Sequence, residues 1–211
     1  MANQDGELEK TFSWLIKDLK DNEYHTKTIL FCSSLKEFGY IYDTLLQCLP
    51  DTHLKYIGMY HGRTPERPKD QVLSDIVKYD SQIELVVATS ALGMGINIPD
   101  ISKVLHYGIP KDIEAYVQAT GRGGRDGSSN VCVLYYRNYH LRNCDVKMRE
   151  FIKNKEHCCR KDIQIFLELS KSQCLCYIIV VTYVRKNALV VRALQSCTKV
   201  QKLIYWMPKT T

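Results

Sequence analysis

Short apolar segments alternate with segments of helical periodicity over about the first 140 residues, and this alternation constrains the fold more than any other feature. Residues 83–88 are apolar nearly throughout, as expected of a parallel strand that is covered on both faces. Other candidate strands are residues 28–32, 55–60, 104–107 and 131–136, and candidate helices are residues 7–20, 35–49, 65–79 and 112–119. Strands that alternate with helices predict an α/β domain of three layers with a central, mostly parallel sheet.

Polar residues lie at the ends of four of these strands. Ser33 and Ser34 follow the first strand, His61 follows the second, residues 89–97 follow the third, and residues 106–110 end the fourth. Ligands of parallel sheets gather in the loops beyond the carboxyl ends of the strands. We therefore expect these four loops to share one edge of the sheet.

The alternating pattern weakens after about residue 140. Residues 141–152 and 161–169 have helical character, whereas residues 174–211 have no clear period. We therefore expect one domain over residues 1–145, followed by a short helical or irregular tail over residues 146–211. The longest uncharged apolar run, residues 174–184, is shorter than the roughly 20 residues of a membrane-spanning helix. We interpret it as a buried strand or as a segment that lacks its partner, and expect no membrane association.

Charge and cysteine content narrow the function only slightly. The chain has 29 Lys and Arg against 23 Asp and Glu, a net charge of +6, which is compatible with a nucleic-acid partner but does not require one. Its nine cysteines are scattered and odd in number, in a chain too long for a disulfide-dominated fold. We expect reduced thiols, as in the cytosol or nucleus.

Residues 118–127 read Gln-Ala-Thr-Gly-Arg-Gly-Gly-Arg-Asp-Gly, which places two arginines three apart among four glycines. Glycine allows sharp turns and close approach of the backbone to a partner. Arginine offers a flat, permanently charged fork that suits phosphate oxygens. We expect this turn to grip a polyphosphate; the alternative is a solvated basic loop.

A second glycine loop, residues 89–97, follows the third candidate strand. Its two glycines permit close approach of the backbone, and Thr89, Ser90 and Asn97 supply neutral donors. Such donors suit contacts to a sugar–phosphate backbone that do not depend on the base sequence. An ordinary glycine turn is an equally good interpretation, and for Asn97 so is a simple loop cap.

Together these segments resemble the RecQ family of DNA helicases. Residues 83–89 with 93–99 resemble motif V of that family, residues 118–127 resemble motif VI, and residues 29–34 resemble motif IV. Residues 60–62 and 106–111 resemble the segments that follow motif IV and lead into motif VI. The resemblance covers about residues 5–145. It implies the second RecA-like domain of a superfamily 2, 3′-to-5′ DNA helicase that acts in DNA repair and recombination, in the nucleus or, in a prokaryote, the cytoplasm.

The resemblance also implies roles for individual residues. Arg125 resembles the arginine finger that reaches the γ-phosphate of ATP. Arg122 resembles the neighbouring arginine, which contacts phosphate or holds the loop. Gln118 resembles a residue that couples nucleotide binding to the contacts between domains. The residues that would line the ATP cleft are Gly93, Gly95, Asn97 and Asp126. The residues that would face DNA, single-stranded or at a duplex junction, are Ser33, Ser34, His61, Thr89 and Ser90.

A complete motor of this kind also needs a Gly-x-x-x-x-Gly-Lys-Ser/Thr loop and an acidic pair for Mg²⁺ and water. The 211 residues contain no Gly-Lys pair and no Asp-Glu pair. The resemblance assigns those parts, and most of the ATP and Mg²⁺ contacts, to a first RecA-like domain that is missing here. We therefore expect the chain alone not to hydrolyse ATP at a useful rate.

RecQ proteins commonly continue into a zinc-binding helical subdomain, and Cys159-Arg160-Lys161 resembles its start. The following cysteines depart from the pattern, because Cys174 and Cys176 have one residue between them, whereas zinc ligands usually sit two to four apart. Cys159, Cys174 and Cys176 are therefore weak candidates, and we expect no zinc. The tail is interpreted as a partial, atypical start of that subdomain or as unrelated sequence.

Two other functions stay open. One is half of a DEAD-box RNA helicase; such proteins usually carry His in place of Gln118 and Arg-Gly-Ile-Asp in place of residues 94–97, so both positions favour RecQ. The other is a non-catalytic module that binds nucleic acid or regulates a full-length helicase.

Overall fold

The computed structural model describes residues 2–21, 26–93, 96–124, 130–153, 179–185 and 188–192. The helices are α1 (Ala2–Asp21), α2 (Leu35–Cys48), α3 (Glu66–Ile76), α4 (Ile113–Thr120) and α5 (Val146–Lys153), with 3-10 helices η1 (Asp51–Tyr56), η2 (Ser90–Gly93) and η3 (Asn138–Arg142). The strands are β1 (Lys27–Cys32), β2 (Ile57–Tyr60), β3 (Leu85–Ala88), β4 (Ile101–Tyr107), β5 (Val131–Tyr136), β6 (Ile179–Arg185) and β7 (Ala188–Arg192).

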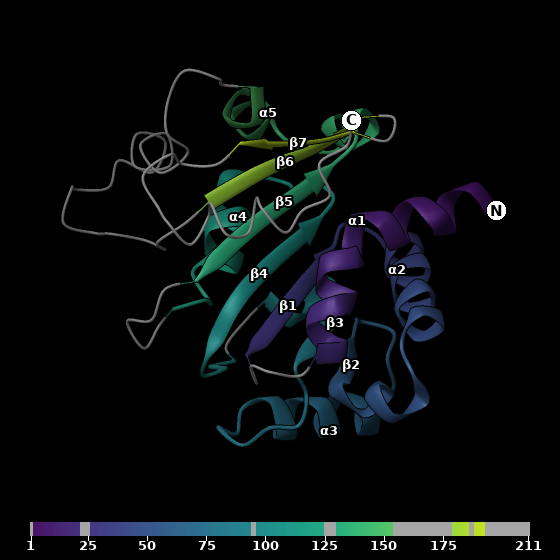
Figure 1. Ribbon diagram of the computed structural model, residues 1–211. Coiled ribbons are helices and arrows are strands. Elements are labelled where there is room, and N and C mark those ends of the chain that lie inside the picture. The colour runs from purple at the N-terminus through teal and green to yellow at the C-terminus, as the bar shows by residue number, and fades with distance from the viewer. Residues whose placement is uncertain are drawn as a thin grey trace.

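The strands form one sheet in the order β2-β3-β1-β4-β5-β6-β7 (Figure 1). All neighbours pair in parallel except β6 and β7, which pair antiparallel. In the middle of the sheet, Ile29 of β1 lies beside Val86 of β3 and Val104 of β4. All five strands expected from the sequence are present, which confirms the mostly parallel sheet.

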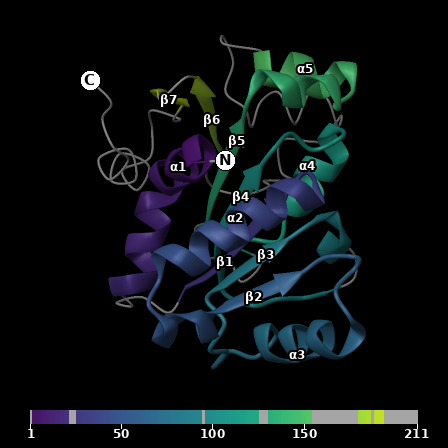
Figure 2. The same ribbon diagram turned by 90° about the vertical axis from the view of Figure 1, so that its right-hand side faces the viewer.

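Helices cover both faces of the sheet, which confirms the three layers. Alternate residues of each strand face opposite cores: Leu30 packs with α1 and α2, whereas Ile29 packs with α3, α4 and α5. Figure 2 shows α1 and α4 on opposite sides of the sheet. The near-continuous apolar character of the strands follows from this double coverage.

Several element boundaries differ from expectation, and for two strands the structure shows the cause. The strand expected over residues 55–60 begins only at Ile57, because the preceding residues form η1 and the amide of His53 bonds the carbonyl of Pro50 at 2.8 Å. The strand expected over residues 104–107 begins three residues earlier, because Ile101 pairs with Lys27 and Lys103 pairs with Thr28 across an irregular step in the ladder.

The tail is helical at α5, as expected, but also contributes two strands. β6 covers part of the apolar run at residues 174–184 and lies beside β5, with Val180 opposite Val133. Helix α5 packs its Met148 and Phe151 into the same core as α3 and α4.

The domain boundary expected near residue 145 stays a prediction. The candidate helix at residues 161–169 and the zinc candidates Cys159, Cys174 and Cys176 lie outside the described residues.

Two kinds of feature are absent from the described part of the chain. None of the described helices is both long and apolar enough to cross a membrane. No group of three or more His, Cys, Asp or Glu side chains in the described ranges is arranged to hold a metal ion.

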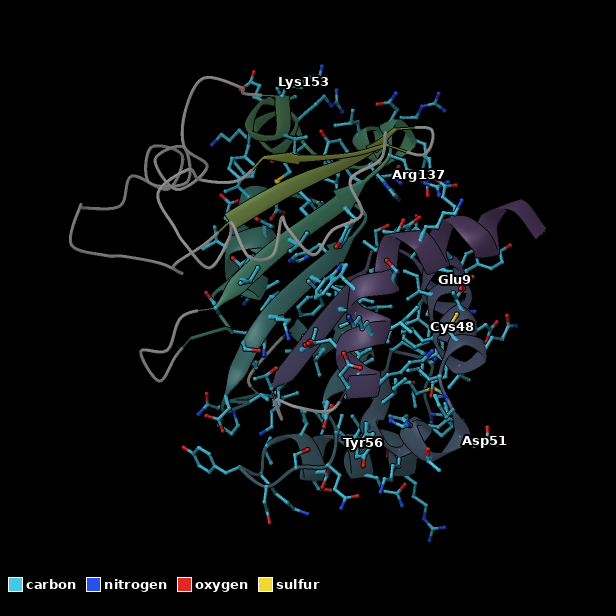
Figure 3. The ribbon with its side chains drawn as sticks, in the orientation of Figure 1. Glu9, Cys48, Asp51, Tyr56, Arg137 and Lys153 are labelled. Carbon is cyan, nitrogen blue, oxygen red and sulfur yellow. The ribbon has the colours of Figure 1, made fainter. Side chains whose placement is uncertain are left out.

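Two polar contacts between residues far apart in sequence hold helix α1 against β5 and the residue that follows it. The Trp14 indole donates to the Tyr135 hydroxyl at 2.9 Å inside the core. Arg137, which is labelled in Figure 3, follows β5. Its Nη2 lies 2.8 Å from Oε2 of Glu7. These contacts fix the helix across the carboxyl half of the sheet.

Gly108 lies where the chain leaves β4 and passes close to the end of β1. Its φ is +97°, and a Cβ added there would lie 2.2 Å from Oγ of Ser33. Its amide donates to the carbonyl of Tyr135 at 2.8 Å. Only glycine combines this backbone conformation with this approach.

Gly108→Ala is expected to lower the free energy of unfolding by about 2–4 kcal/mol, the sum of left-handed strain and a steric clash. Gly39→Ala is the matched control, because it lies inside α2 and an added Cβ meets nothing within 4 Å. That control should raise stability by about 0.5–1 kcal/mol through helix propensity. Urea unfolding measures both, and changes of the same sign and size would contradict this account of Gly108.

Candidate functional site

The polar loops that follow the strands lie together at the carboxyl edge of the sheet. The Ser33 amide donates to the Tyr107 carbonyl at 3.0 Å, which joins the ends of β1 and β4. The Thr89 amide donates to the Tyr60 carbonyl at 3.1 Å, which joins the ends of β3 and β2. With β1 and β3 adjacent in the sheet, the expectation of one shared edge is confirmed.

A pocket of about 270 Å³ opens at this edge between the ends of β1 and β4 and the helix α4. It brings together Ser33, Ser90 and Gln118, three of the residues predicted from sequence to take part in function. The remaining lining residues are Phe31, Cys32, His106, Gly108, Ile109, Pro110, Lys111, Ala115, Ala119, His140 and Asn143. Ser34, His61 and Thr89 do not line it.

Ser33 and Ser34 both direct their hydroxyl groups to Glu37. Ser34 caps α2 and accepts from the Glu37 amide at 3.2 Å, while its hydroxyl donates to Glu37 Oε2 at 3.0 Å. The Ser33 hydroxyl donates to the same oxygen at 2.5 Å. Each serine has one hydroxyl proton, so in this arrangement both hydroxyls offer a ligand only acceptor lone pairs.

The other oxygen of Glu37 accepts from η3. Tyr139 Oη donates to Glu37 Oε1 at 2.8 Å, and His140 Nε2 lies 2.5 Å from the same atom. The Arg137 amide donates to His140 Nδ1 at 2.8 Å, so the ring proton lies on Nε2 and points to the carboxylate. Burial alone would raise the pKa of Glu37, but the hydrogen bonds from His140, Ser33 and Tyr139 outweigh it and lower the pKa to about 2.

Sequence reasoning missed this cluster of Glu37, Tyr139 and His140. The spacing of Ser34 and Glu37 is that of a capping box and was a usable local signal. Nothing local pointed to Tyr139 and His140, because they lie more than 100 positions from Glu37.

His61 and Thr89 sit on the same edge with local partners. The Arg63 amide donates to His61 Nδ1 at 3.1 Å, and the His61 ring packs edge-on against Phe38 at 4.8 Å. Thr89 Oγ1 accepts from the Ala91 amide at 3.5 Å, and its carbonyl accepts from the Leu92 amide at 3.1 Å. Both residues therefore belong to ordered turns, and their predicted DNA contacts stay predictions.

The arginine turn begins at the end of α4, and Arg122 is buried in it. Its Nη1 donates to the Ile96 carbonyl at 3.0 Å, which ties the turn to the segment containing Asn97. A Cβ added at Gly123 would lie 2.0 Å from Nδ2 of Asn130, so glycine is required there. The Gly124 amide donates to the carbonyl of Ile101, the first residue of β4, at 3.2 Å.

Gln118 and Arg122 therefore face different parts of the domain. Gln118 lines the pocket at the carboxyl edge, whereas Arg122 and Gly124 bond toward the start of β4. Of the predicted ATP-cleft residues, Gly93 ends η2 and Asn97 is exposed. Gly95, Arg125 and Asp126 lie outside the described residues, so their roles stay predictions.

Glu37→Gln is expected to lower the free energy of unfolding by about 2 kcal/mol near pH 7, after allowance for solvent screening. The folded-state pKa of about 2 lies below the ordinary value of 4.5, so the ionised carboxylate stabilises the fold above about pH 4.5. That stabilisation fades as the pH falls from 4.5 toward 2.

Urea unfolding of wild type and variant near pH 7 and near pH 3 tests this dependence. The difference between the two proteins should shrink at the lower pH. Glu150→Gln, at an exposed position of α5, is the matched control and should change little. A difference that is the same at both pH values would contradict the role of the ionised carboxylate.

Comparison with known proteins shows the family to which the chain belongs. The sequence family described as helicase conserved C-terminal domain matches residues 10–127. The putative ATP-dependent RNA helicase R290 of Acanthamoeba polyphaga mimivirus is 39% identical over 116 residues, which are 54% of this chain and 20% of that protein. The ATP-dependent DNA helicase RecQ of Bacillus subtilis is 33% identical over 143 residues, which are 67% of this chain and 22% of that protein.

Among solved structures, that of Mss116p bound to ssRNA and AMP-PNP is similar in fold, with a TM-score of 0.55 at 19% identity. The similarity covers 74% of this chain and 29% of that one. The chain spans about a fifth of the length of the two relatives named above. Since the family match covers more than half of the chain and includes both glycine loops, the chain belongs to the helicase conserved C-terminal domain family, as a RecQ-like domain of superfamily 2.

Proposed function

We propose that the chain is the second RecA-like half of an ATP-dependent, 3′-to-5′ DNA helicase of the RecQ type. In that role it supplies an arginine finger and contacts to the DNA backbone, and serves DNA repair and recombination, in the nucleus of a eukaryote. The observation that carries this proposal is the family match over residues 10–127, because it includes both the loop at residues 89–97 and the turn at residues 118–127.

The arginine turn supports the catalytic part of the proposal. Arg122 is held by the Ile96 carbonyl and Gly123 is closely packed against Asn130, so the backbone is fixed shortly before Arg125. Arg125 then extends to the γ-phosphate of an ATP held with Mg²⁺ by a first RecA-like domain. An arginine supplied from a facing domain stabilises the charge that spreads over the transferring phosphoryl group.

The carboxyl edge supports the DNA-binding part. Ser33, His61, Thr89 and Ser90 follow three adjacent strands, and such an edge suits contact with a sugar–phosphate backbone. Because the hydroxyl protons of Ser33 and Ser34 go to Glu37, the donors for phosphate come mainly from the other residues of this edge.

An RNA substrate is a second candidate, favoured by the name of the mimivirus relative, which is a putative RNA helicase. Unwinding of matched DNA and RNA duplexes by the full-length protein separates the two. We expect DNA to be unwound faster, because Gln118 and Asn97 depart from the DEAD-box pattern.

Arg125→Ala in the full-length helicase is expected to lower the turnover number of ATP hydrolysis by about 10³ or more. Affinity for single-stranded DNA should stay close to that of wild type, because Arg125 reaches the nucleotide and not the DNA. Steady-state ATPase assays and fluorescence anisotropy measure the two quantities. Arg67→Ala, at an exposed position of α3, is the control, and turnover like that of wild type in Arg125→Ala would refute the arginine finger.

The chain alone is expected to bind single-stranded DNA weakly and with strong salt dependence, and not to hydrolyse ATP. If about four phosphates are contacted, affinity should fall by about 50-fold between about 50 and 200 mM salt. Anisotropy titrations with a labelled oligonucleotide over this range give the slope. An affinity that does not change with salt would argue against backbone contacts.

A further inference from the structure

The arginine turn after α4 is held at three points, and one of them comes from the residue before β5. Nη1 of Arg122 donates to the Ile96 carbonyl at 3.0 Å, and the Gly124 amide donates to the Ile101 carbonyl at 3.2 Å. The third point is Asn130, whose side chain is fully buried at 0% exposure. Asn130 lies outside the segments that resemble helicase motifs, so its part in the turn is visible only in the structure.

Strand β5 approaches the end of α4 and the arginine turn with two side chains in succession. Cys132 is the second residue of β5, and its Sγ lies 4.0 Å from the carbonyl oxygen of Thr120, the last residue of α4. Asn130 is two positions before Cys132 and meets the chain three residues beyond Thr120, at Gly123. The turn therefore rests against the beginning of β5.

The contact between Gly123 and Asn130 leaves no room for a larger residue. A Cβ added at Gly123 would lie 2.0 Å from Nδ2, 2.8 Å from Cγ and 3.0 Å from Cβ of Asn130, whereas ordinary contacts begin near 3.4 Å. The buried Asn130 side chain cannot swing into solvent to relieve this clash. Positive φ angles occur at Gly108 and Gly124 but not at Gly123. The requirement for glycine at position 123 therefore comes from the Asn130 side chain and not from the backbone conformation.

This contact encloses the segment that contains Arg125. In the sequence, Arg125 follows Gly123 by two positions and precedes Asn130 by five. Packing of Gly123 against Asn130 thus fixes the separation between the two ends of that segment. Placement of a catalytic group matters strongly, because a misplacement of about 1 Å can cost about 10²-fold in rate.

We propose that Asn130 is a positioning residue for the arginine finger. Its buried side chain fills the space beside Gly123 and sets the place from which Arg125 reaches the nucleotide. This inference rests on the proposed function and adds to it a residue from outside the arginine turn. It also makes positions 123 and 130 a coupled pair, in which the size of one side chain limits the size of the other.

The test moves side-chain volume from one position to the other in the full-length helicase. Gly123→Ala introduces the clash and should lower the turnover number of ATP hydrolysis by about 30-fold, because the turn is displaced. The KM for ATP and the affinity for single-stranded DNA should stay within about twofold of wild type, because Arg125 acts on the transferring phosphoryl group. Asn130→Ala leaves a gap beside Gly123 and should lower turnover by about fivefold.

The double variant, Gly123→Ala with Asn130→Ala, is the decisive measurement. It removes the contacts at 2.0 and 2.8 Å and leaves the contact between the two Cβ atoms at 3.0 Å, which a shift of a few tenths of an ångström relieves. Turnover should return to within about threefold of wild type, above that of either single variant.

Gly124→Ala is the matched control for this rescue. The φ of Gly124 is +67°, so an added side chain strains the backbone whatever space surrounds it. Gly124→Ala should also lower turnover, but a second substitution, Asn130→Ala, should not restore it.

Urea unfolding of the 211-residue chain gives a measurement that does not depend on ATP. The unfolding midpoint of Gly123→Ala should lie below that of wild type, and addition of Asn130→Ala should raise it again. Wild-type turnover in Gly123→Ala, a double variant no more active than Gly123→Ala, or a loss of DNA affinity in step with turnover would each overturn the positioning role. If Arg125→Ala is inactive in the same assay, the proposed function survives that outcome. Wild-type turnover in Arg125→Ala would overturn both.

Discussion

Four side-chain donors converge on the carboxylate of Glu37, and the arrangement of the carboxyl edge depends on them. Ser33 and Ser34 reach it from the end of β1, and Tyr139 and His140 reach it from η3 after β5. Strand β4 lies between β1 and β5, so Glu37 connects the two loops that flank the end of β4. A charged acceptor with several donors is stronger than the same number of neutral bonds, which is why one residue is sufficient for this connection.

Helix α4 connects the two halves of the proposed function. Its eight residues begin at the Asp112 cap beside the pocket and end at the turn that Arg122 anchors to Ile96. Ala115, Gln118 and Ala119 line the pocket on the carboxyl side, whereas Gly124 bonds to the first residue of β4. In the proposed function, this short helix would link the edge proposed to contact DNA with the turn proposed to hold a phosphate.

Much of the fold could be predicted from the sequence, because doubly covered strands are recognisable as apolar runs and the helices carry caps such as Ser34 and Asp112.

The features that escaped prediction depend on distant partners. Strand β6 has no periodicity of its own and pairs with β5, about 47 positions earlier. Tyr139 and His140, two of the four side-chain partners of Glu37, come from η3. Arg122 is buried where its guanidinium donates to the carbonyl of Ile96, which lies 26 positions earlier. The glycines and arginines of the candidate site were found from their local spacing, whereas His106 was identified only as part of a motif, because its environment comes from Phe31 and Tyr116.

The two tail strands change which part of the sheet is open to other molecules. Without them, β5 would present a row of unpaired backbone groups at the border of a parallel sheet. With them, β6 takes up those groups and the border moves to β7, a strand of five residues that runs in the opposite direction. The border strand at this side of the described sheet therefore runs against the direction of the others, and a chain that adds a strand here would pair with β7 and not with β5.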